Sequence, residues 1–172
     1  WSSSITTNLK KFFAKLYRIS SYTNVTNSNI GQNLYGALYS STSYKGKFHT
    51  GLDFNNGSAY DTYNIYTPVS GTILKAVQTN GRINLYNEEL DCTFIFLHMT
   101  IDSNIAEGDN VGANVLMGKQ SGWSNSTSTY YASHLHIEVH SGEYTGNAST
   151  IPADSFTSLG AVSPYSYIAS CV

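Results

Sequence analysis

The eight residues 133–140 constrain the fold more than any other part of this sequence, because apolar and polar side chains alternate strictly along them. Leu135, Ile137 and Val139 share one face. The opposite face carries His134, His136, Glu138 and His140. A period of two is typical of a β-strand with one buried face, so other strands must pair with this one and a core must cover it. Among the side chains on that face, the imidazoles of His134 and His136 are only two positions apart.

From residue 48 onward the sequence predicts a series of short strands, because apolar runs alternate with turn residues such as Asn80-Gly81. The predicted strands are 64–69, 72–78, 82–86, 92–99, 115–117 and 133–140. Fourteen Gly, 14 Tyr and only 12% charged residues favour strands and turns over long surface helices. The predicted fold class is therefore mostly β, an antiparallel sheet core with long loops. One such loop is expected over 118–133, leading into the histidine-bearing strand.

Residues 1–20 differ from everything that follows. Apolar side chains recur there at helical spacing, at Leu9, Phe12, Phe13, Leu16 and Tyr17. Four of the nine basic residues lie in the same stretch, at Lys10, Lys11, Lys15 and Arg18. The pattern predicts a short amphipathic N-terminal helix. We favour a helix that packs its apolar stripe on the edge of the domain over one that contacts an anionic wall polymer or a membrane.

A chain of 172 residues is long enough for one domain with a sizeable core. We predict a helix and flanking loop over 1–46, with one short strand near 34–39, and a single domain over 47–172. The net charge of -2 argues against nucleic-acid binding, and no apolar run is long enough to span a bilayer. Low charge and two cysteines suit a secreted or cell-surface protein. We expect a monomer. Cys92 and Cys171 either pair or remain free thiols, and both alternatives stay open.

His49 and Asp53 lie four positions apart, on either side of Gly51. On a straight strand their Cα atoms would be about 13 Å apart, so the backbone must bend at Gly51 if both side chains are to reach one ion. With His136 they would form two imidazoles and one carboxylate, a ligand set typical of zinc sites that leave the fourth position to water. Taken singly, Asp53 would be a turn-capping carboxylate and His98 a core histidine. His140 is predicted to be a surface histidine outside the ligand set.

The order of His-x-Gly-x-Asp, Leu-His and His-Leu-His resembles the lysostaphin-type (LytM-like, M23) zinc metallopeptidases. The matching segments are 48–54, 67–73, 96–99, 107–118 and 134–139, so the resemblance covers about 48–142. It implies a small antiparallel β-sheet core whose loops line a narrow groove. Ala132-Ser133 stands where that family commonly has Gly-Pro.

The resemblance also implies a site and an activity. His49, Asp53 and His136 would hold Zn²⁺, and His98 and His134 would be the two catalytic histidines that do not bind the metal. One of these two would take a proton from the attacking water and the other would stabilise the oxyanion, in an order left open. The implied activity is that of a secreted endopeptidase that cleaves bacterial peptidoglycan peptides, in the cross-bridge or the stem, Gly-Gly bonds among them.

Two alternatives keep the fold but not the activity. The chain is a non-catalytic wall-binding or activator module, or a latent enzyme in which an upstream asparagine fills the open metal position. The asparagines available in the flank are Asn24, Asn27, Asn29 and Asn33. A serine or cysteine hydrolase is disfavoured, because the sequence has no Gly-x-Ser-x-Gly and neither cysteine has a histidine motif beside it.

Overall fold

The structure is a computed structural model that describes residues 2–30, 34–40, 45–57, 62–124, 129–148 and 161–172. Two α-helices are present in these ranges, α1 (Ser3–Tyr17) and α2 (Tyr165–Ser170), with 3₁₀ turns η1 (Tyr22–Asn24) and η2 (Gln78–Asn80). The strands are β1 (Leu52–Phe54), β2 (Asn64–Tyr66), β3 (Gly71–Val77), β4 (Arg82–Asn87), β5 (Cys92–Leu97), β6 (Met99–Ile101), β7 (Asn110–Val111), β8 (Leu116–Ser124) and β9 (Thr129–Ser141). The predicted fold class, mostly β with a short N-terminal helix, is confirmed.

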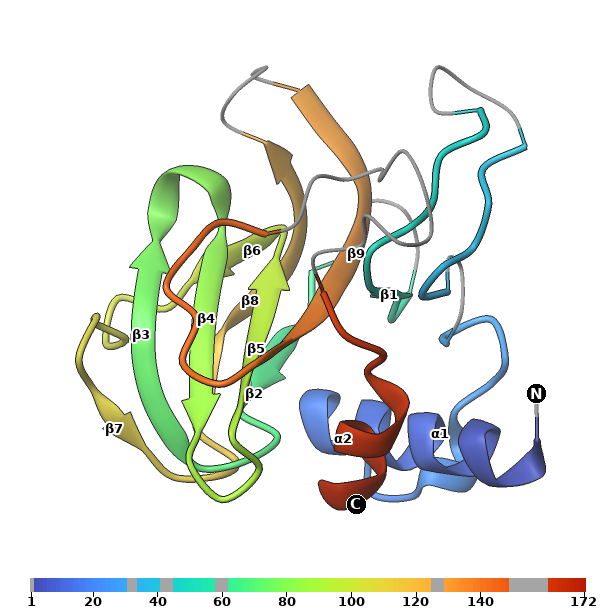
Figure 1. The fold of residues 1–172 in the computed structure, drawn as a ribbon, viewed down its shortest axis with the longest axis horizontal. Coiled ribbons are helices and arrows are strands. Elements are labelled where there is room, and N and C mark those ends of the chain that lie inside the picture. Colours follow the sequence, from blue (N-terminus) through green and yellow to red (C-terminus); the bar gives the residue numbers. More distant parts are fainter. Residues whose placement is uncertain (1, 31–33, 41–44, 58–61, 125–128, 149–160) are drawn as a thin grey trace.

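The strands form one antiparallel sheet in the order β2-β8-β9-β5-β4-β3-β7, with β1 paired to β9 and β6 to β8 (Figure 1). The alternating strand predicted at 133–140 lies within β9, which pairs with β8, β5 and β1. His136 faces Asp53 of β1 on one side and Leu97 of β5 on the other. The strand that carries the histidines is therefore central to the pairing scheme.

The apolar face of β9 lies in the core. Leu135, Ile137 and Val139 are fully buried, as the alternation predicts. α1 covers this face, because the Phe12 ring lies 6.2 Å from the ring of Phe54 and 6.1 Å from that of Phe94, measured between centroids. Burying one such ring contributes about 1.5–3 kcal/mol, so α1 is held mainly by its apolar stripe. Side chains on both sides of the predicted boundary at residue 46 thus share one core.

Both ends of α1 have the expected local signals. The Ser2 hydroxyl accepts a hydrogen bond from the backbone N–H of Ile5, which caps the first turn. The helix ends at Arg18, whose φ of 54° is left-handed and whose N–H bonds back to the last turn. The Tyr17 hydroxyl then donates to the buried Gln120 of β8, which in turn donates to Ser133 of β9. These bonds connect the helix to the two strands that lead into the site.

Some local features of the structure differ from the sequence predictions. The loop predicted over 118–133 is wrong for most of its length, because β8 continues to Ser124 and β9 begins at Thr129. Its Ser, Thr and Tyr residues are compatible with a strand once a partner strand supplies backbone hydrogen bonds. The strand predicted near 34–39 is reduced to one bridge between Leu38 and Phe48. α2 was not predicted, since six residues after Pro164 are too short to show a helical period.

The two cysteines are free and buried in the structure. Burial raises the pKa of the Cys92 thiol to about 12 and that of Cys171 to about 11, so both are protonated at neutral pH. No helix in the described part of the chain is long and apolar enough to cross a membrane.

Candidate metal centre

Pairing of β1 with β9 brings the first two site residues together. Asp53 and His136 are direct partners across the two strands, on the face opposite the α1-covered core. The distance from Asp53 Oδ1 to His136 Nδ1 is 3.0 Å. Asp53 is 5% exposed and His136 1%, so the pair is almost withdrawn from water.

A bend at Gly51 adds His49, as predicted from its spacing. His49 Nε2 lies 3.1 Å from His136 Nδ1 and 3.2 Å from Asp53 Oδ1. At Gly51 an added Cβ would lie 2.3 Å from the Ile137 carbonyl oxygen and 2.8 Å from His136 Nε2. Only glycine permits this close approach, so the bend requires glycine at position 51.

The flank upstream of the bend orients the His49 ring. Its Nδ1 lies 3.2 Å from the carbonyl oxygen of Leu34. A carbonyl oxygen can only accept a hydrogen bond. Nδ1 therefore carries the hydrogen, and the lone pair of Nε2 faces Asp53 and His136. Backbone hydrogen bonds from Gly36 N to His49 O and from His49 N to Ala37 O keep the two segments together.

The three donor atoms fit a tetrahedral zinc site. Ligand distances of about 2.0–2.1 Å require donors about 3.3 Å apart at the edges of a tetrahedron. The observed separations are 3.0, 3.1 and 3.2 Å. Two imidazoles and one carboxylate are also the donor types that zinc prefers. The structure thus brings His49, Asp53 and His136 into a group that could hold a metal ion.

The contacts among these side chains also shift the pKa values of Asp53 and His136. Burial acts to raise the pKa of Asp53, but its contacts with the imidazoles of His136 and His49 outweigh burial and hold that pKa well below its usual value. Burial likewise opposes protonation of His136, yet hydrogen bonds to Asp53 and Glu138 raise its pKa to about 9. Asp53 is therefore ionised at neutral pH.

The two predicted catalytic histidines lie beside this group. His98 follows β5 with a left-handed φ of 65°, a strained conformation for a side chain of its size. Its ring lies 4.6 Å from the ring of His134 and 6.2 Å from that of His136, between centroids. Burial and the neighbouring His134 lower the pKa of His98 to about 3, so its ring is neutral at neutral pH.

His134 is one-quarter exposed and reaches toward the same point. Its Nδ1 lies 2.7 Å from the carbonyl oxygen of Ala132 and so donates to it. The lone pair of Nε2 is then left facing the site, 3.9 Å from Asp53 Oδ1. All five residues singled out by the sequence motifs are therefore gathered at one place on the polar face of β9.

By sequence, the chain matches no protein-family model and no curated protein. By structure it is similar to the catalytic domain of the antimicrobial peptidase lysostaphin from Staphylococcus simulans, with a TM-score of 0.55 and 20% identity over 83% of this chain and 92% of that one. It is also similar to LytU, with a TM-score of 0.56 and 20% identity over 84% and 86% of the two chains. A longer lysostaphin chain matches with a TM-score of 0.57 and 21% identity over 84% of this chain and 50% of that one. The chain has the lysostaphin-type fold.

Within this lysostaphin-type fold, the interpretation of His140 as a surface histidine is wrong. His140 is 5% exposed, and its Nε2 lies 3.0 Å from Oε2 of Glu138. Sequence reasoning also missed Glu138, which is fully buried next to His136. Strand alternation already placed both on the face of His136, so the signal was available. Alternation assigns a face, however, and tertiary packing decides whether that face is covered.

The flanking asparagines divide between the described and undescribed parts of the chain. The side-chain amide of Asn29 donates to the carbonyl oxygen of Asn55 and accepts from the Thr26 hydroxyl. Both ends of this amide are therefore hydrogen-bonded within a turn. Asn33 lies outside the described residues.

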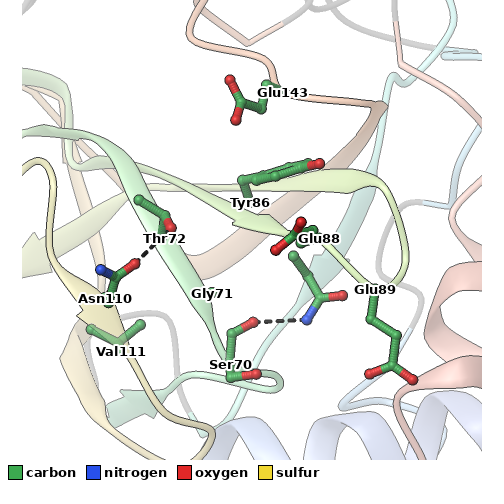
Figure 2. A pocket seen from close by; sticks show the side chains of 10 residues that line it. Ser70, Gly71, Thr72, Tyr86, Glu88, Glu89, Asn110, Val111 and Glu143 are labelled. Atoms are coloured by element: carbon green, nitrogen blue, oxygen red, sulfur yellow. Dashed lines mark hydrogen bonds between the residues drawn. The ribbon is translucent and has the colours of Figure 1, made fainter.

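A separate cavity of about 610 Å³ lies at the other end of the strands (Figure 2). It is lined by Ser70, Gly71, Thr72, Tyr86, Asn87, Glu88, Glu89, Asn110, Val111 and Glu143. None of the predicted site residues lines it. Its three glutamates are exposed.

Proposed function

We propose that this protein is a zinc metalloendopeptidase that cleaves peptide bonds of bacterial peptidoglycan, in the cross-bridge or the stem peptide, outside the cytoplasm. The observation that carries the proposal is the triangle of His49 Nε2, Asp53 Oδ1 and His136 Nδ1, with sides of 3.0 to 3.2 Å. The lysostaphin-type fold supports the peptidase class, since lysostaphin is described as an antimicrobial peptidase. The resemblance of the motif order to lysostaphin-type peptidases supports a peptide substrate from the bacterial wall.

His49, Asp53 and His136 would hold the zinc ion. Bound there, zinc supplies Lewis-acid polarisation of the scissile carbonyl and a lowered pKa for an attacking water. The single carboxylate of Asp53 provides the negative charge that a dication requires in a buried site. The remaining chemistry belongs to the side chains around it.

His134 is suited to act as the general base. Because its Nδ1 donates to Ala132, its Nε2 has a free lone pair that accepts the proton of the attacking water. His98 is suited to the other role. Its ring is neutral and lies against His134, so an N–H of His98 can donate to the oxyanion that forms on the scissile carbonyl.

Purified cell walls of differing cross-bridge chemistry provide the test. The zinc-loaded chain is incubated with each wall type, with and without a chelator, and the fragments are identified by mass spectrometry. We expect new peptide termini at one bond type, lost with the chelator and in an Asp53→Ala variant. A zinc-loaded chain that releases no fragment from any wall type would overturn the peptidase proposal and favour a binding module.

A further inference from the structure

Glu138 is a fully buried carboxylate on β9, with hydrogen-bond donors at both oxygens. Oε1 accepts from the Thr50 hydroxyl at 2.7 Å and from His136 Nε2 at 3.2 Å. Oε2 accepts from His140 Nε2 at 3.0 Å. Burying a carboxylate is costly unless hydrogen bonds replace its water shell, and these three donors do so.

The donors come from both segments that bear the metal-binding residues. Thr50 lies between His49 and the bend at Gly51, whereas His136 belongs to β9. One carboxylate therefore joins the bend to the strand behind the donor triangle. Its second oxygen is held by His140, whose ring stacks on Tyr144 with centroids 4.0 Å apart and planes 7° apart. The arrangement places Glu138 on the far side of the His136 ring from Asp53.

This position determines which nitrogen of His136 is free. A His136 ring that binds a metal keeps only one hydrogen, and because Nε2–H donates to Glu138, the nitrogen left to bind is Nδ1, the atom that faces Asp53 and His49. The opposite tautomer would carry its hydrogen on Nδ1, the nitrogen that faces Asp53 and His49, and Nδ1 could then not bind the metal. Glu138 would face the lone pair of Nε2 and lose a hydrogen bond. A carboxylate behind a ligating histidine commonly plays this part in metal sites.

We propose that Glu138 is a positioning residue that holds His136 in the form that binds metal through Nδ1, while its bond to Thr50 secures the bend that carries His49. The proposal rests on the zinc site proposed above. It concerns metal affinity and the protonation pattern of one ring, so it can fail while the peptidase proposal stands.

The first test uses the zinc-loaded wild-type chain and ¹⁵N NMR of its imidazole rings. We expect His136 to bind through Nδ1 and to carry its proton on Nε2. Binding through Nε2 would overturn the proposal whatever any variant does. A wild-type chain that retains no zinc would overturn both this proposal and the peptidase function.

The second test is Glu138→Gln, which keeps the size of the side chain but removes its charge and one acceptor. We expect zinc affinity, measured by competition with a fluorescent chelator, to fall about 10–100-fold. Thr50→Val, which leaves the His136 contact in place, is expected to lower affinity less. The matched control is Glu143→Gln, the same substitution at an exposed position just after β9. It should leave zinc affinity unchanged. Wild-type affinity in a folded Glu138→Gln variant would overturn the proposal while zinc binding by the wild type stands.

Discussion

The two ends of strands β5 and β9 place carboxylates in opposite environments. Toward the Leu97–His136 end, where Glu138 stands opposite Ile95, Asp53 and Glu138 are buried and every contact described above is with a histidine or a hydroxyl. At the Cys92–Ser141 end, Glu88 and Glu143 border the open cavity of Figure 2 and are exposed to water. Exposed carboxylates are solvated and interact weakly, whereas buried ones must be paired. An open cavity lined by exposed glutamates is therefore a weaker candidate for a metal site than buried ligand atoms that converge on one point.

The largest effect is expected when one of the three converging donors is removed. His49→Ala, Asp53→Ala or His136→Ala should abolish zinc retention and hydrolysis together, beyond the roughly 10–100-fold loss typical of residues behind the ligands. Zinc per chain after dialysis is the measurement, with far-UV circular dichroism to check folding. If an Asp53→Ala variant kept zinc and activity, the buried carboxylate would be no more important than the exposed ones at the other end of the strands.

The next largest effect separates zinc binding from catalysis. His98→Ala and His134→Ala should retain one zinc per chain, because neither ring contributes to the donor triangle. Turnover on the wall substrate should fall by about 10²–10⁴, the usual contribution of a general acid or base. Loss of zinc from either variant would move that histidine into the ligand set and contradict the assignment.

A change in α1, which covers the opposite face of β9, tests whether zinc loss reflects the site or the fold. Phe12→Ala removes a fully buried ring that packs on Phe54 and Phe94, so the free energy of unfolding should fall by about 3–5 kcal/mol. Urea denaturation measures this change. The folded fraction should still bind one zinc per chain, and Lys10→Ala on the same helix should change stability by less than about 0.5 kcal/mol.

The smallest effect is expected at the exposed end. Glu88→Gln and Glu143→Gln should leave zinc content and hydrolysis unchanged and alter stability by less than about 0.5 kcal/mol, since both carboxylates are in water. Thermal unfolding and the wall-digestion assay are sufficient to check this. A large loss of activity in either variant would show that the cavity of Figure 2 takes part in substrate binding.

Most of the candidate site could be predicted from the sequence because its signals are local. The two-residue period around His136 assigned the apolar face of β9 correctly, and the spacing of His49 and Asp53 around Gly51 required a bend that the structure contains. What could not be predicted depends on partners distant in sequence. The pairing of Ser121 with His134 turned most of an expected loop into strand, because the residues of 118–133 have no strong preference without a neighbour.

The amino-acid pattern was sufficient for most of the longer strands, for the face of β9 on which His134 and His136 lie, and for the choice of His49, Asp53 and His136 as candidate metal-binding residues that the fold brings together. Burial was decided only by packing. The same alternation is compatible with an exposed Glu138 and an exposed His140, and the fold covers both by bringing Thr50 and Tyr144 against them. The physical reason is that side-chain direction follows from backbone geometry over two residues, whereas exclusion of water requires segments that approach from elsewhere in the chain.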